Sequence, residues 1–200
     1  MNDIQKNMFS CIGERRNTVD KYYLNKEEAI LLIIDIQEKL APAINQGDSV
    51  IKNTNVLVAA AKNMDIPIIV TEQYPKGLGP TVPEIEENLE GVEKFDKITF
   101  TACTEGVIES LNKTGRKKVI ITGMETHICV FQTTRDLLNQ GYDVFIAADG
   151  VSSRTEENKS NGLELMRDMG AVISNTETIL YDLLKVSGTP QFKALSKLIK

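Results

Sequence analysis

The chain has 200 residues, of which 42% are hydrophobic and 26% charged, as is typical of one globular domain. Its net charge of −5 argues against nucleic acid and anionic membranes as partners. The longest apolar run, residues 29–34, is too short to span a bilayer, and the N-terminus lacks the pattern of a secretory signal. We therefore expect a soluble, cytoplasmic protein that binds neither nucleic acid nor membranes.

Two scarce residue types limit the sites that the chain can build. His127 is the one histidine in the sequence, so the usual zinc centres with two or three histidines are excluded. Cys11, Cys103 and Cys129 are an odd number of cysteines without a Cys-x-x-Cys pair, which favours free thiols in a reducing compartment. We therefore expect no disulfide framework, no multi-histidine metal site and no cofactor.

Residues 1–28 are polar and charged, and we interpret them as an N-terminal extension with a helical turn or two, lying over a domain formed by residues 29–200. In that domain, short β-branched runs alternate with segments of helical period, which is typical of βαβ units. The pattern predicts a three-layer α/β/α fold with a doubly wound, mostly parallel six-stranded sheet in the order 3-2-1-4-5-6. The predicted strands are 29–34, 67–71, 91–96, 118–122, 143–147 and 171–174, and the predicted helices are 48–64, 104–114, 126–140, 155–169 and 176–186.

The predicted strand order places three chemically useful side chains at one edge of the sheet. Ligands of such sheets bind beyond the carboxyl ends of the strands, where the strand order reverses. The first and fourth strands flank that reversal, so Asp35, after the first strand, should face the helix that carries Cys129. Lys97 follows the third strand and ends at the same edge. We expect Asp35, Lys97 and Cys129 to meet in one crevice.

The position of Cys129 in the first turn of a helix favours the thiolate, because the helix dipole and unpaired backbone N–H groups stabilise negative charge there. Lys97 would lower the thiol pKa further, and Asp35 is the available base. The same N–H groups are a candidate oxyanion hole.

Each of these residues also has a plainer interpretation. Cys129 is a buried small side chain, Asp35 a strand-terminal cap, and Lys97 a solvated charge. His127 is most simply a helix residue. The segment 72–83, rich in proline and glycine, is either the rim of a pocket or a surface connection.

Several segments resemble the isochorismatase-like cysteine hydrolases. The similarity covers about residues 29–185, and a further likeness to isochorismatase-domain-containing proteins lies in the loop and near the C-terminus. The segments that carry the family resemblance are LIIDIQ (32–37), KITF (97–100), GMETHICV (123–130), GYDV (141–144) and DGVSSR (149–154), and those that carry the further likeness are TEQYPKGLGPT (71–81) and PQFK (190–193).

The resemblance implies an α/β/α fold and an Asp–Lys–Cys triad, here Asp35, Lys97 and Cys129. It also implies a cis peptide between Met124 and Glu125 that would aim the backbone N–H groups of Glu125 and Cys129 at an oxyanion. Nicotinamidase relatives carry aspartate and histidine metal ligands after the second strand, and this chain has no histidine there. Authentic isochorismatases lack the nucleophilic cysteine. Both activities are therefore disfavoured.

From these features we expect a cysteine hydrolase that cleaves a C–N bond of a small amide, carbamoyl or ureido compound through a Cys129 thioester. We expect a small-molecule substrate and a homo-oligomer. The alternative is a non-catalytic or regulatory binding protein that retains the hydrolase fold, and a thiol redox enzyme is a third possibility. The predicted pocket residues are Gln37, Tyr74, Phe100, Thr126 and His127.

Overall fold

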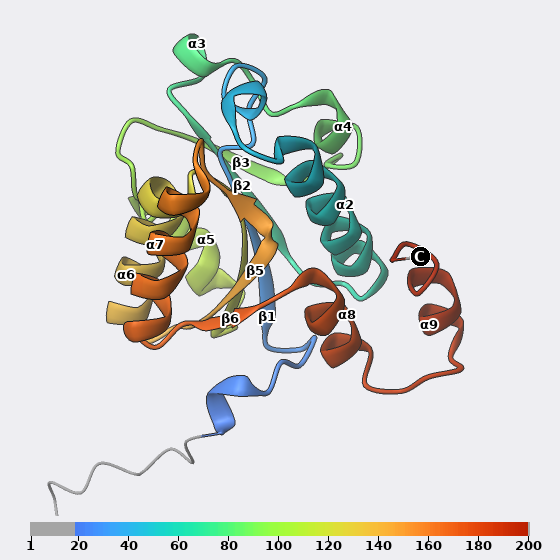
Figure 1. Cartoon of the computed structure of the whole chain (residues 1–200). Coiled ribbons are helices and arrows are strands. Elements are labelled where there is room, and N and C mark those ends of the chain that lie inside the picture. Colours follow the sequence, from blue (N-terminus) through green and yellow to red (C-terminus); the bar gives the residue numbers. More distant parts are fainter. Residues whose placement is uncertain (1–18, 200) are drawn as a thin grey trace, which may run out of the picture.

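The structure, a computed structural model, describes residues 19–199. A central sheet is covered on both faces by helices (Figure 1). Its strands follow the order β3-β2-β1-β4-β5-β6, and every pair of neighbours is parallel. The predicted fold class and strand order are therefore confirmed. The strands are β1 (Ala29–Ile34), β2 (Ile68–Gln73), β3 (Glu93–Lys97), β4 (Lys118–Met124), β5 (Asp143–Ser152) and β6 (Val172–Ser174).

The central strands are buried on both faces because their side chains are apolar throughout. All residues of β1 and β4 are buried, as expected for parallel strands with helices above and below them. The side chains of β1 alternate between two apolar clusters, one on each face of the sheet. The order reverses between β2–β1 on one side and β4–β5 on the other, and in such sheets ligands bind beyond the carboxyl ends of the strands that flank the reversal, here β1 and β4.

The helices divide between the two faces of the sheet. Figure 1 shows α5, α6 and α7 on one side and α2, α8 and α9 on the other. Within residues 19–199, no helix has the length and apolar character needed to cross a membrane. The longer helices are α2 (Gly47–Asn63), α5 (Glu105–Lys113), α6 (Phe131–Asn139), α7 (Glu156–Asp168), α8 (Thr176–Leu184) and α9 (Pro190–Leu195).

Four short elements lie outside the predicted helices, and α9 was not predicted either. Three of them lie in the loops that follow β1 and β2: η2 (Ala41–Ala43), α3 (Pro75–Leu78) and α4 (Pro83–Glu86). The fourth, the single turn η1 (Asp20–Tyr22), belongs to the predicted extension. The extension is attached to the domain, because the Leu24 backbone N–H donates to Asp182 Oδ2 at 3.0 Å. Its residues 1–18 lie outside the described part of the chain.

Gly123 lies in β4, where this strand pairs with the last residue of β1. It pairs with Ile34 across the two strands and has a φ of +143°. A Cβ atom at this position would lie 2.2 Å from the Ile34 carbonyl oxygen, which is far inside van der Waals contact. Glycine is therefore required here for two independent reasons, the backbone conformation and the close approach of the neighbouring strand.

We expect Gly123→Ala to lower the free energy of unfolding by more than about 3 kcal/mol, because the added methyl group must push β1 and β4 apart. The control is Gly115→Ala, at a φ of +67° with no heavy atom within 4 Å of the added Cβ, which should cost about 1 kcal/mol. Urea unfolding followed by circular dichroism gives both values. Equal losses in the two variants would show that the contact with Ile34 is unimportant.

Candidate active site

Three strand ends bring Asp35, Lys97 and Cys129 together. Asp35 directly follows β1, Lys97 ends β3, and Cys129 lies in η3 (Thr126–Val130), a π-helical turn between β4 and α6. Lys97 Nζ is 2.6 Å from Asp35 Oδ2, and neither side chain is exposed to solvent. The thiol of Cys129 contributes to the electrostatic surroundings of both. The structure therefore places the three predicted residues in one buried cluster.

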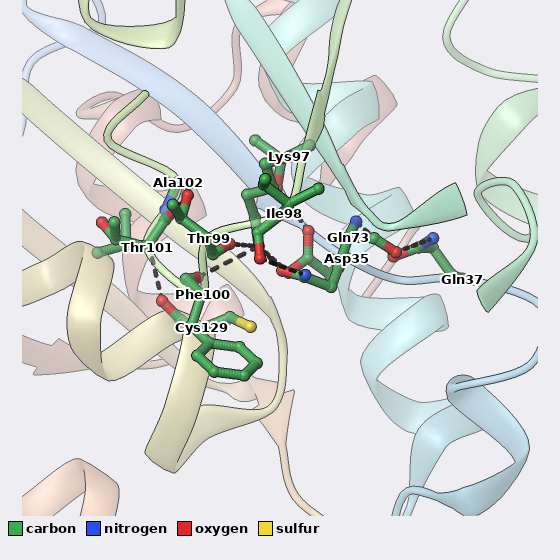
Figure 2. A network of polar contacts seen from close by, with 12 residues as sticks. Asp35, Gln37, Gln73, Lys97, Ile98, Thr99, Phe100, Thr101, Ala102 and Cys129 are labelled. Atoms are coloured by element: carbon green, nitrogen blue, oxygen red, sulfur yellow. Dashed lines mark hydrogen bonds and ion pairs between the residues drawn. The ribbon is translucent and has the colours of Figure 1, made fainter. Parts of the chain in front are cut away.

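The Lys97 ammonium is the centre of this cluster (Figure 2). Besides Asp35, it donates to Gln73 Oε1 at 2.7 Å and to the carbonyl oxygens of Thr99 and Phe100, each at 3.2 Å. An ammonium group has three N–H bonds, and all three are used. Asp35 is the one charged acceptor among these partners, so the ion pair is the dominant attraction, and the carbonyl groups satisfy the rest of the buried charge.

The thiol of Cys129 differs from the expectation that its helix position lowers its pKa. Burial and the neighbouring Asp35 carboxylate raise the pKa of the Cys129 thiol to about 12, although the Lys97 ammonium and the backbone of Glu125 act in the opposite direction. The side chain is 6% exposed, and the loss of solvation outweighs the helix terminus. The expected thiolate is therefore wrong for the resting protein: Cys129 is a neutral thiol beside a potential base.

Burial also raises the pKa of the Asp35 carboxyl, while Lys97, the hydroxyl of Thr71 and the Cys129 thiol oppose the rise. A carboxylate that is desolvated but still paired accepts a proton more readily than one in water. The arrangement therefore suits transfer of the thiol proton to Asp35 at the moment when the sulfur reacts.

The residues that precede Cys129 are held by the two residues that directly follow β5. The backbone N–H and the Nε of Arg154 each donate to Glu125 Oε2 at 3.1 Å. His127 Nδ1 lies 3.0 Å from Ser153 Oγ. Thr126 is fully buried. The backbone of Glu125 contacts the Cys129 thiol, while its carboxylate holds Arg154. The peptide bond between Met124 and Glu125 is cis.

The helix α7 packs closely on the same turn. A Cβ atom on Gly162 would lie 3.0 Å from the Cα and N atoms of His127, so the absence of a side chain at this position allows the backbones to approach. This contact supports the turn that carries Cys129.

The remaining predicted pocket residues have two different environments. Tyr74 and Phe100 are 55% and 54% exposed, which suits a pocket rim, and Tyr74 lines a hollow of about 310 Å³ that Lys97 and Ile98 also border. Gln37 is fully buried, and its side chain amide donates to the carbonyls of Gln73 and Gly79 at 3.1 and 2.6 Å. We therefore assign Gln37 to the support of the loop after β2 and no longer to substrate contact.

Two residues near Asp35 were missed in the sequence, although both lie in the TEQ segment at 71–73. Thr71 Oγ1 donates to Asp35 Oδ1 at 2.8 Å, and Gln73 accepts from Lys97 and donates from Nε2 to the Ile98 carbonyl at 3.1 Å. Their alternation along β2, two residues apart, is the signal that could have placed both on the face toward Asp35.

Among residues 19–199, no three His, Cys, Asp or Glu side chains gather as a metal site would require. Cys103 is partly buried, and burial raises the pKa of its thiol to about 11. Its Sγ lies 3.8 Å from the Thr133 carbonyl oxygen. Cys11 lies outside the described residues.

The chain resembles known proteins along most of its length. The family model for the isochorismatase domain matches residues 29–178. Over 177 residues, the chain is 44% identical to the secreted isochorismatase effector Isc1 of Phytophthora sojae, covering 86% of this chain and 84% of that protein. Over 177 residues it is 40% identical to isochorismatase domain-containing protein 2 of Danio rerio, covering 88% and 89%. A solved structure described as MAR1 ribonuclease from Caenorhabditis elegans has a TM-score of 0.84 and 40% identity, covering 88% and 91%.

We expect Cys129 to show no thiolate absorbance between pH 6 and 9, because burial and Asp35 hold its pKa near 12. The measurement is the difference in absorbance at about 240 nm between the chain and Cys129→Ser, which cancels the tyrosines and the other two thiols. A difference step near pH 7 would contradict the neutral thiol.

We expect Lys97→Met to lower the free energy of unfolding by about 3 kcal/mol at pH 8 and by less at pH 5, since it leaves Asp35 buried and unpaired. The unfolded carboxyl titrates near pH 4, while burial raises the pKa of folded Asp35. The folded variant therefore binds more protons than the unfolded chain, and its stability falls as the pH rises.

Urea unfolding at both pH values tests this expectation. The double variant Lys97→Met with Asp35→Asn is the control, because it removes the carboxylate and should remove the added pH dependence. An equal loss at pH 5 and pH 8 in Lys97→Met would show that the ion pair does not carry the effect.

Proposed function

Because the chain belongs to the isochorismatase family, we propose that it is a hydrolase that cleaves the C–N bond of a small amide, carbamoyl or ureido compound through a thioester on Cys129. The family resemblance read from the motifs is confirmed by the domain match. The fold is that of isochorismatase-like hydrolases. The substrate class and the mechanism are our proposal, and the single observation that carries them is the buried Asp35–Lys97 pair, whose carboxylate lies within hydrogen-bonding reach of the Cys129 thiol.

In the first half of the reaction, Asp35 takes the proton of the Cys129 thiol while the sulfur attacks the substrate carbonyl carbon. The carbonyl π electrons move to oxygen and form a tetrahedral oxyanion. Asp35 then returns the proton to the nitrogen of the leaving amine, the C–N bond breaks, and the carbonyl re-forms as a thioester. The raised pKa of the Asp35 carboxyl suits both transfers.

In the second half, Asp35 takes a proton from water while the water oxygen attacks the thioester carbon. Collapse of the second tetrahedral intermediate breaks the C–S bond, and Asp35 returns the proton to the sulfur. The products are an acid and the neutral thiol of Cys129, so the site ends in the state in which it began.

The backbone N–H groups of Glu125 and Cys129 are the proposed donors to the oxyanion. The backbone of Glu125 already acts on the thiol in the resting structure, which supports its position near the reacting atoms. Lys97 stays in contact with Asp35 throughout, because its other acceptors are neutral, and so it keeps the base oriented. Thr126, His127, Tyr74 and Phe100 remain proposed pocket residues.

The alternative is a binding protein without useful turnover. The burial of Cys129, which is only 6% exposed, favours this alternative. A redox role has no support from Cys103, because its Sγ has the Thr133 carbonyl oxygen as partner at 3.8 Å and not the Cys129 thiol. Ribonuclease and secreted effector are descriptions of two relatives. For this chain we propose a small-molecule substrate, a homo-oligomeric state, a cytoplasmic location and no metal or cofactor.

We expect Cys129→Ala to lower hydrolysis of an active member of an amide, carbamoyl and ureido panel by at least about 10³-fold, because the covalent path is lost. Intact-mass spectrometry of the wild-type chain with that compound should show an acyl adduct, which peptide mapping places on Cys129. Asp35→Asn should show neither adduct nor turnover, although its thiol is present.

The same panel distinguishes the alternatives. Turnover by Cys129→Ala within a few-fold of wild type would exclude the thioester path. Tight binding of a panel compound without turnover would indicate the binding protein. Cleavage of a short RNA by wild type but not by Cys129→Ala would replace the amide substrate.

A further inference from the structure

We propose that Thr71 is a positioning residue of the site, whose carbonyl and hydroxyl groups together hold Asp35 with its carboxylate toward the Cys129 thiol. The inference rests on the proposed function, in which Asp35 is the base. It concerns a residue on a strand that carries none of the three reacting groups. Figure 2 shows the cluster that β2 joins through Gln73.

The backbone of Asp35 is anchored on Thr71. Asp35 follows the last residue of β1 and has a φ of +55°, in the left-handed region that few non-glycine residues adopt. Its backbone N–H donates to the Thr71 carbonyl at 3.1 Å. This bond extends the pairing of β1 with β2 by one residue while the chain turns out of the sheet, so the turn that presents Asp35 is anchored on Thr71.

The two oxygens of the Asp35 carboxylate accept hydrogen bonds from two different residues. Thr71 Oγ1 donates to Oδ1 at 2.8 Å, and Lys97 Nζ donates to Oδ2 at 2.6 Å. One donor alone would leave the carboxylate free to rotate about its Cβ–Cγ bond. Two donors from two strands fix its plane, and this plane determines which oxygen lone pair faces the thiol.

The surroundings of Thr71 require its hydroxyl to be hydrogen-bonded. Its side chain is fully buried, in register with Ile34 on one side and Phe95 on the other. A hydroxyl in such apolar surroundings must be paired to avoid a desolvation cost. Because a hydroxyl has one proton and gives it to Asp35, it stabilises the charged form of the base.

The test follows the pH dependence of Cys129 alkylation by iodoacetamide, with the Cys129 peptide quantified by mass spectrometry. The titratable groups that face Asp35 among residues 19–199 are Lys97 and Cys129. If Asp35 removes the thiol proton, the rate has a plateau and falls on the acidic side as the carboxyl is protonated. An unassisted thiol with a pKa of about 12 instead loses about tenfold per pH unit at every pH below it.

We expect Thr71→Val, which keeps the shape and removes the hydroxyl, to move the acidic limb up by about one pH unit, because a hydrogen bond to the charged carboxylate is lost. Thr71→Ser keeps the hydroxyl and should follow the wild-type limb. A merely structural role would change the rate without moving the limb. If Thr71→Val does not fold, Thr71→Ala and Thr71→Ser give the same comparison.

The outcomes separate this inference from the proposed function. A wild-type plateau that Asp35→Asn abolishes, with an unmoved limb in both Thr71 variants, overturns the role of Thr71 and leaves Asp35 as the base. A wild-type rate without a plateau overturns the base itself, and the inference fails with it. A limb moved equally by Thr71→Val and by Thr71→Ser, which keeps the hydroxyl, would show that the hydroxyl does not cause the shift, and this also overturns the proposal.

Discussion

The ion pair between Lys97 and Asp35 is the interaction on which the site depends. Two opposite charges with no solvent exposure lie 2.6 Å apart, and such a pair is stable only when every remaining hydrogen-bonding group also finds a partner. Gln73, Thr71 and the carbonyl groups after β3 supply those partners. The pair thereby joins β1, β2 and β3 at the open edge of the sheet, and its carboxylate adds to the burial that raises the pKa of the Cys129 thiol.

The fold was largely predictable because its causes are local. Runs such as 30–34 and 119–121 are apolar on both faces, which indicates buried parallel strands, and the helical segments between them require the crossovers of a doubly wound sheet. The short helices α3 and α4 were not predicted, because each has four residues, which are too few to show a periodic pattern. The predicted helix 126–140 begins with the π-helical turn η3 and continues as α6.

The proximity of Asp35, Lys97 and Cys129 could be predicted from the sequence, whereas their electrostatics could not. Strand order alone brought Asp35, Lys97 and Cys129 to one edge, and the structure places them there. The pKa of Cys129 depends on how much solvent the packed side chains exclude, which the sequence does not specify, so the expected helix effect was overridden by burial. Gln37 was expected to line the pocket, whereas its buried side chain donates to the main-chain carbonyls of Gln73 and Gly79.

Lys97 holds the segment after β3 through main-chain atoms and not through the side chains of that segment. The ammonium binds the main-chain oxygens of Thr99 and Phe100, while the side chains of Ile98 and Phe100 are 83% and 54% exposed. Mutations can therefore exchange those side chains without removing the main-chain oxygens that hold the Lys97 ammonium beside Asp35. Under the proposed function, substrate selectivity could then diverge among descendants while the three proposed reacting residues are inherited unchanged.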